Sequence, residues 1–168
     1  AYAGVTAATL TLSATDTVNW MIDRFPPHQQ GSARSLLGRV LRGVICQRLV
    51  DRADGRGRVA VVESLVGTHK VRDAIIDGAD PSVLERLMSE GEYHGMATFD
   101  QALFHLFSEE YVSLDEALER AVHPEDFRIA VQQAGLALPD VRGSIRLGSG
   151  PSSASVGGSF WRCAAAAP

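Results

Sequence analysis

Few residues in this sequence have the type and spacing that phosphate chemistry requires. Lysine occurs once, as Lys70 in His69-Lys70-Val71. A P-loop, the phosphate-binding loop of many nucleotide hydrolases, needs a glycine-rich turn followed by Gly-Lys-Ser/Thr, because its lysine reaches the terminal phosphates. The sequence therefore contains no P-loop.

Metal and nucleophile signatures are equally scarce. The histidines do not pair with one another or with a cysteine at ligand spacing, so we expect no metal site. They are His28, His69, His94, His105 and His123. Val59 to Glu63 resembles the apolar strand ending in an acid that holds Mg²⁺ in nucleotide hydrolases, but any strand ending in a carboxylate has this pattern. No Gly-x-Ser-x-Gly elbow occurs. The residues alone predict no complete active site.

The composition is that of a globular chain of 168 residues, 45% hydrophobic and 21% charged. This length suits one domain with a core, and no apolar run approaches the ~18–20 residues of a membrane-spanning helix. The net charge of −4 gives no reason to expect direct nucleic acid binding. Cys46 and Cys163 form no framework, so we expect a reducing, cytosolic setting. A start at Ala1 is typical of a fragment or a processed piece.

The elements that must position these residues begin with an α/β part, residues 1–66. Val5 to Leu12 is apolar and threonine-rich, which predicts a strand. A short helix is expected next, with Thr15 or Asp16 as its N-cap. Its inward-facing residues are expected to be Val18, Met21 and Ile22. Phe25-Pro26-Pro27 ends this helix and begins the next, since proline is tolerated in the first turn of a helix but not in its interior.

The second helix has an apolar stripe at helical spacing. Its members are Leu36, Leu37, Val40, Leu41 and Val44. Gly38 and Gly43 weaken the helix, which favours close packing against a neighbour. A β-hairpin is expected over residues 45–66, with strands Ile45–Arg52 and Arg58–Val66, because Asp54-Gly55 between them is a strong turn signal.

Residues 67–138 predict a helical subdomain. A helix ending at Gly78 is expected to bury Val71, Ala74 and Ile75, and Asp80-Pro81 begins another that ends at Gly91. Thr98 to Gln101 and Ser113 to Glu116 have the spacing of capping boxes, which are architectural. Pro124 opens a last helix carrying Phe127, Val131 and Leu136. Residues 139–168 are rich in Gly, Ser and Ala and predict a disordered tail.

Four stretches resemble the PilT-type twitching motility ATPases of the secretion ATPase superfamily. Their order and spacing over residues 6–136 make the resemblance specific. They are Phe25-Pro26-Pro27-His28-Gln29-Gln30, Gly43-Val44-Ile45-Cys46-Gln47-Arg48-Leu49, Arg52-Ala53-Asp54-Gly55-Arg56-Gly57-Arg58-Val59 and Glu92-Tyr93-His94-Gly95-Met96-Ala97-Thr98-Phe99-Asp100-Gln101-Ala102-Leu103. A fifth, Lys70-Val71-Arg72-Asp73-Ala74-Ile75, lies where this family carries the Ala-Ile-Arg-Asn-Leu-Ile motif tied to pilus retraction. Arg72 is kept, whereas Lys70 and Ala74 depart from the pattern.

The resemblance implies the C-terminal half of a motor. It implies an α/β fold, namely the C-terminal portion of a RecA-like P-loop domain in residues 1–66, followed by the helical subdomain. In the family such chains form hexameric rings at the cytoplasmic face of the inner membrane. They use ATP and Mg²⁺ to disassemble pili and work with an inner-membrane platform protein. Here the family's P-loop half is missing, and Ala8-Thr9-Leu10-Thr11 stands where the family has Ala-Thr-Leu-His.

Two functional hypotheses follow. The chain is either part of a retraction ATPase that is active only within a longer chain or a ring, or a non-enzymatic truncated paralogue that docks onto an intact motor. No catalytic residue is assigned, and ATP is not expected to bind this chain alone. Arg48 and Arg58 are weak candidates for charge contacts near a nucleotide or subunit boundary, with structural ion pairs as the alternative.

Overall fold

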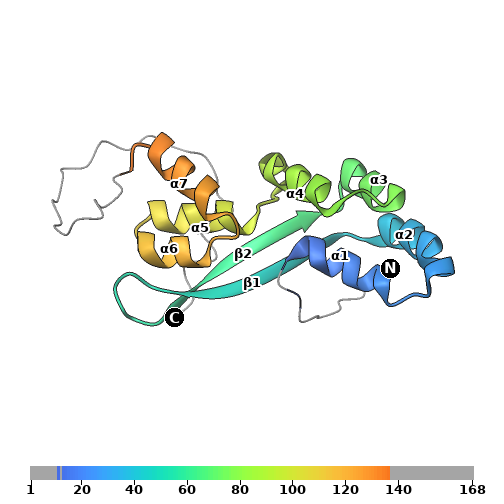
Figure 1. Ribbon diagram of the computed structural model, residues 1–168, viewed down its shortest axis with the longest axis horizontal. Coiled ribbons are helices and arrows are strands. Elements are labelled where there is room, and N and C mark those ends of the chain that lie inside the picture. The colour runs from blue at the N-terminus through green and yellow to red at the C-terminus, as the bar shows by residue number, and fades with distance from the viewer. Residues whose placement is uncertain (1–10, 12, 137–168) are drawn as a thin grey trace, which may run out of the picture. The chain divides into compact units, whose positions relative to one another are not determined.

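The chain forms helices and one β-hairpin in the computed structural model, which describes residue 11 and residues 13–136 (Figure 1). The elements follow one another as α1 (Ala14–Asp23), α2 (Pro27–Val40), β1 (Gly43–Asp51), β2 (Arg58–Val66), α3 (His69–Asp77), α4 (Pro81–Ser89), the 3₁₀ turn η1 (Glu92–His94), α5 (Phe99–Ser108), α6 (Leu114–Arg120) and α7 (Pro124–Gln133). The predicted α/β class is confirmed. None of the helices in the described ranges is long and apolar enough to cross a membrane. The strand predicted at Val5–Leu12 and the tail predicted from residue 139 lie outside the described residues, apart from Thr11.

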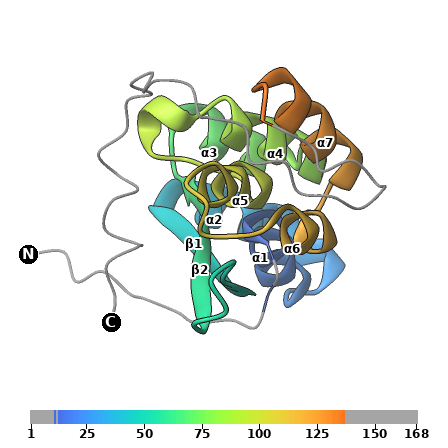
Figure 2. The same cartoon turned by 90° about the vertical axis from the view of Figure 1, so that its left-hand side faces the viewer.

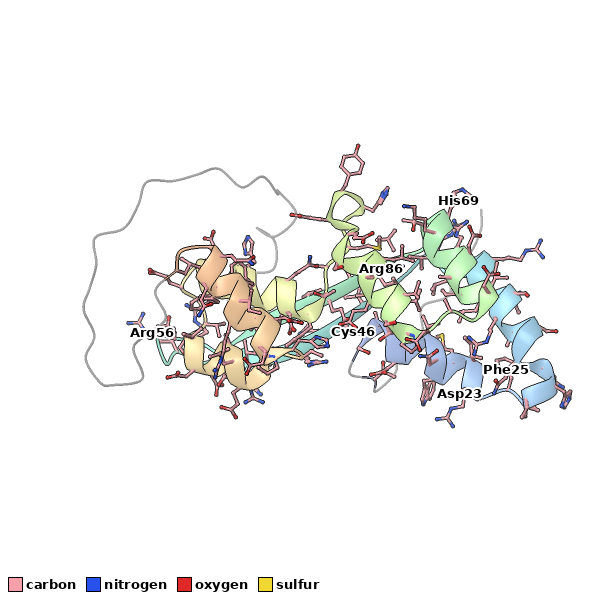
Figure 3. All side chains as sticks on the ribbon, turned by 45° about the horizontal axis from the view of Figure 1, so that its top comes forward. Asp23, Phe25, Cys46, Arg56, His69 and Arg86 are labelled. Carbon is pink, nitrogen blue, oxygen red and sulfur yellow. The ribbon has the colours of Figure 1, made fainter. Side chains whose placement is uncertain are left out.

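The hairpin forms where the turn signal predicts it. β2 has the predicted bounds, and β1 begins two residues earlier than predicted and ends one earlier. In the turn, Arg52 forms an ion pair with Asp54 at 2.7 Å, and Asp54 Oδ1 accepts a hydrogen bond from Arg56 N. Gly55 and Gly57 have φ of +69° and +93°, which glycine adopts without strain. Figure 3 shows Arg56 projecting from this tip of the hairpin.

By its internal contacts the chain divides into two compact units, each with its own core. The first comprises residues 1–48 and 62–102. Its buried core consists of Ala14, Val18, Ile22, Cys46, Leu65, Val71, Ile75, Leu84, Met88 and Met96. The second comprises residues 49–61 and 103–168, where Phe127 of α7 packs against Phe104 and Phe107 of α5 with ring centroids 5.9 and 6.2 Å apart. The domain bounds expected from sequence remain a prediction.

Two helix expectations are wrong. Ser13, and neither Thr15 nor Asp16, caps α1, since its side chain accepts a hydrogen bond from Asp16 N at 3.0 Å. The predicted stripe of the second helix is also not one buried face: Leu36 and Val40 are 62% and 59% exposed, and Val44 belongs to β1. The buried residues of α2 are Ala33 and Gly38. Small residues face inward here because α2 lies close against α3 (Figure 2).

The helix ends of the second half follow the sequence signals closely. Thr98 and Gln101 form a reciprocal capping box: Gln101 N donates to Thr98 Oγ1, and Thr98 N donates to Gln101 Oε1. Ser113 accepts from Glu116 N, but the Glu116 carboxylate accepts from Asp51 N and Arg120 Nε and not from the cap residue. The second box is therefore half formed, because its acid ties β1 to α6.

Candidate functional site

The segment Lys70–Ile75 forms most of α3 and presents two distinct faces. Val71 and Ile75 are 0% and 2% exposed and enter the core of the first unit, whereas Lys70 and Asp73 point to solvent. The helix begins at the Thr68 N-cap, whose hydroxyl accepts from Val71 N, and ends at Gly78 with φ of +68°. Ala74 is half-buried. The helix that the sequence predicts here, with its apolar spacing, is thus present.

Close contact with α2 fixes the position of α3. A Cβ added to Gly38 would lie 2.7 Å from Ile76 Cγ1 and 3.0 Å from the Arg72 carbonyl oxygen. Only a residue without a side chain allows the two backbones to come this near. The sequence predicted close packing at Gly38 but not its partner. Ile76, which is 37% exposed and lies just past the motif, was missed because its spacing gives no inward signal.

Arg72 is the motif residue whose side chain could bind an acidic group. Its side chain is half-buried, and its Nε is buried without a hydrogen-bond partner among the described residues. A guanidinium has five N–H donors in a fork that matches carboxylate or phosphate oxygens. Because the Arg72 carbonyl lies at the α2–α3 contact, this side chain starts from a rigid part of the unit. The arrangement can present a positioned cation to an acidic partner.

A chain of hydroxyl and thiol groups lies at the start of α1. Thr11 Oγ1 is 2.6 Å from Thr17 Oγ1, and Thr17 Oγ1 donates to the Ser13 carbonyl oxygen at 2.8 Å. Thr17 Oγ1 is also 3.8 Å from Cys46 Sγ in β1, inside the unit (Figure 3). The deletion or replacement of the family's histidine near Thr11 remains a prediction from the resemblance.

Glu63 joins β2 to the same end of α1. Its Oε1 accepts a hydrogen bond from Ala14 N at 3.4 Å, at the helix end where backbone N–H groups favour negative charge. The residue is 6% exposed, and burial raises the pKa of its carboxyl above the usual value, although Arg48 opposes this shift. Burial likewise raises the pKa of the Cys46 thiol. Both raised pKa values are those of side chains buried in the protein core.

The Mg²⁺ interpretation of the strand ending at Glu63 gains no support from this geometry. Glu63 lies within β2, not at its end, and its oxygen contacts a backbone amide. Across the part of the chain that the structure describes, no group of three or more His, Cys, Asp or Glu side chains is arranged to hold a metal ion.

The two candidate arginines have different surroundings in the structure. The guanidinium of Arg48, in β1, lies over the ring of Phe99 at 4.0 Å from its centroid, in cation–π geometry. Two of the stretches quoted above, around Arg48 and Phe99, therefore meet in space. Arg58 begins β2 and is exposed. Contacts of either arginine with a nucleotide or a neighbouring subunit remain a prediction.

One hollow among the described residues lacks the features of a phosphate site. A shallow hollow lies on α2, lined by Gly31, Ser32, Ser35, Leu36, Arg39 and Val40. Phosphate cradles use free backbone N–H groups at a helix start or in a glycine-rich loop. The hollow lies along the middle of a helix, where N–H groups bond to carbonyls of the preceding turn. No step of ATP chemistry can be derived from it.

Comparison with known proteins gives the class to which this arrangement belongs. No family model matches the chain. In solved structures, the chain superposes on the ATPase DotB of Legionella pneumophila with a TM-score of 0.51 at 20% identity, covering 73% of this chain and 30% of that one. It superposes on the pilus retraction motor PilT with bound ADP with a TM-score of 0.58 at 30% identity, covering 69% and 32%. The fold is that of a segment of these ATPases.

Sequence relatives narrow the class. The chain is 32% identical over 120 residues to the type IV pilus ATPase PilU of Pseudomonas aeruginosa, covering 71% of this chain and 31% of the relative. It is 33% identical over 117 residues to the type IV pilus retraction ATPase PilT of that organism, covering 70% and 33%. A twitching motility protein of Neisseria gonorrhoeae is 33% identical over 115 residues, covering 68% and 30%. The resemblance is confirmed: over about 70% of its length the chain is homologous to PilT-type twitching motility ATPases. It spans about a third of the length of these relatives.

Proposed function

We propose that this chain is the C-terminal mechanical part of a type IV pilus retraction ATPase. In this proposal residues 1–66 complete a RecA-like domain whose P-loop half is not in the sequence, and residues 67–138 form the helical subdomain that acts on the pilus machinery. The motor is a hexameric ring at the cytoplasmic face of the inner membrane. It uses ATP and Mg²⁺ to return pilin subunits to the membrane through a platform protein.

The observation that carries this proposal is the setting of α3. The helix that matches the retraction motif is fixed to α2 at Gly38, and it holds Arg72 half-buried with one N–H unsatisfied. A rigidly mounted, half-buried cation suits transmission of force to an acidic partner surface. The homology to retraction ATPases supports a role for this helix in a retraction motor.

A chimera tests the proposal. Residues 13–136 replace the corresponding segment of the Pseudomonas aeruginosa PilT, and the hybrid is introduced into a strain that lacks its own PilT. We expect the hybrid to restore twitching, and Arg72→Ala within it to abolish twitching while ATP hydrolysis by the purified hybrid persists. Arg86→Ala, at an exposed arginine of the neighbouring helix α4, is the matched control and should leave twitching intact. Normal twitching with Arg72→Ala would remove the motif from the mechanism.

A second candidate is a non-enzymatic module that docks onto an intact motor. The sequence feature that favours it is the lone lysine, Lys70, which lies in α3 and not in a P-loop. The two candidates differ in the DNA upstream of Ala1: an in-frame Gly-Lys-Ser/Thr loop favours the motor part, and a stop codon favours the module.

A further inference from the structure

The C-terminal end of α3 has no positive charge of its own. Backbone dipoles give the last turn of a helix a partial negative charge, which a nearby Lys, Arg or His side chain stabilises. The last turn of α3 contains no basic residue, and its final residue is the exposed Asp77, whose carboxylate opposes the helix dipole. Because α3 is nine residues long and isolated helices of this length are marginal in water, its end depends on groups from neighbouring elements.

Arg34 of α2 places a cation at this end. A Cβ built on Gly78, the residue that ends α3, would lie 3.5 Å from Arg34 Nε and 3.6 Å from Cδ and Cζ of the same side chain. The guanidinium group therefore lies against the helix end. Both helices belong to the first unit, and they lie side by side in Figures 1 and 2.

The contact at Arg34 differs in kind from two others that hold α3 in place. Gly67 N, two residues before α3, donates to Arg42 O at 2.9 Å. Gly38 meets Ile76 on α3, where a side chain at position 38 would not fit. These two contacts depend on the closeness of the backbone, whereas the one at the end of α3 depends on a charged side chain. A substitution can therefore remove the charge at Arg34 while leaving the other two contacts intact.

We propose that Arg34 is a positioning residue for the retraction motif: it acts as the C-terminal charge cap of α3 and thereby holds Arg72 in its orientation. Arg72 lies less than two helical turns before Gly78, so fraying of the last turn reaches the part of α3 that carries it. Loss of the cap leaves α3 held at its start and at Gly38 only. The role in retraction rests on the proposed function, whereas the capping role does not.

Hydrogen exchange of the 168-residue chain tests the cap. The amides of Gly78 and Ala79 close the last turn with backbone bonds of 3.2 and 2.9 Å, so they report its fraying. Arg34→Gln removes the charge but keeps a polar side chain, and it should lower the protection factors of both amides about two- to fivefold. The effect should shrink at high salt, which screens the charge. Arg39→Gln, at an exposed arginine of the same helix, is the matched control and should leave both protection factors unchanged.

A second substitution separates charge from packing. Asp77→Lys places a cation in the last turn of α3 itself, and in the Arg34→Gln background it should return the protection factors of Gly78 and Ala79 to the wild-type level. Arg34→Lys, which keeps the charge without the planar guanidinium, should also retain this protection.

The same variants in the hybrid with the Pseudomonas aeruginosa PilT test the positioning role. Arg34→Gln should reduce the twitching rate while ATP hydrolysis by the purified hybrid persists, because the motif helix is loosened and the nucleotide half is unchanged. Asp77→Lys, added to Arg34→Gln, should restore twitching. Arg39→Gln should twitch like the unmodified hybrid.

Two results in hydrogen exchange would overturn the cap: unchanged protection in Arg34→Gln, or a loss of protection that Asp77→Lys does not repair. Lost protection together with normal twitching of the Arg34→Gln hybrid would overturn the positioning role. If the unmodified hybrid itself does not twitch, the proposed function fails, and the exchange measurements on the isolated chain still decide whether Arg34 caps α3.

Discussion

Glu63 is a carboxyl group that the fold keeps away from water. Burial raises its pKa above the usual 4.5, the nearby Asp16 and Glu85 push in the same direction, and Ala14 N and Arg48 oppose them. Between the unfolded and the raised folded pKa, the folded state binds more protons than the unfolded state. The contribution of Glu63 to the unfolding free energy is therefore present below about pH 4.5 and is lost as the pH rises through the folded pKa.

Glu63→Gln tests this sign. Glutamine keeps an oxygen for Ala14 N but does not titrate, so the unfolding free energy of wild type minus that of the variant should fall as the pH increases from 4.5. Urea denaturation of both proteins at a series of pH values gives this difference, in which the other carboxyls cancel. A difference that is flat with pH, or rises, would show that Glu63 titrates as it does in the unfolded chain.

At the scale of elements, the α2–α3 contact is the most constrained feature of the first unit. Gly38→Ala places a methyl group 2.7 Å from Ile76 Cγ1 and 3.0 Å from the Arg72 carbonyl oxygen. Overpacking of this kind costs about 1–3 kcal/mol and outweighs the better helix propensity of alanine. Gly38→Ala should therefore lower the unfolding free energy by about 1–2 kcal/mol in urea denaturation.

Gly31→Ala is the matched control on the same helix. A Cβ at Gly31 meets nothing within 4 Å, so only the helix propensity changes. This variant should be more stable than wild type by up to about 1 kcal/mol. If the two variants shift stability in the same direction, the close approach of α2 and α3 is not what glycine provides at position 38.

The elements show where sequence reasoning succeeds. The bounds of β2, the Asp54-Gly55 turn, the Thr98–Gln101 box and the Gly78 helix end were predicted because each depends on neighbours within a few residues. The stripe of α2 was predicted wrongly, because burial of a helix face depends on what covers it. Leu36 and Val40 have the spacing of core residues and yet are exposed.

The candidate site shows the same division. The resemblance located Lys70–Ile75, but the contacts that fix this segment join residues far apart in the chain. Gly38 meets Ile76, Glu63 meets Ala14, and Arg48 covers Phe99. No local period encodes such pairs, and a lone glycine or a strand carboxylate has the same appearance whether its partner exists or not.

At the scale of the whole molecule, the chain has motor motifs without a P-loop. Lys70, the single lysine of the sequence, is not part of a glycine-rich loop and lies exposed on α3. We therefore expect calorimetric titration of the isolated chain with MgATP to show no binding in the micromolar range, since the contacts to the terminal phosphates are missing. The intact Pseudomonas aeruginosa PilT serves as the positive control. Micromolar affinity in this chain would contradict our interpretation of its missing half.

The contact between Gly38 and Ile76 also bears on how this chain and its relatives change over evolutionary time. A larger residue at position 38 requires a smaller one at position 76, because a Cβ at position 38 would also contact the backbone oxygen of Arg72. Substitutions at positions 38 and 76 should therefore covary among homologues, with alanine at the first accompanied by valine or alanine at the second. Such a paired exchange would mark lineages in which α3 keeps its position against α2 while neighbouring residues change.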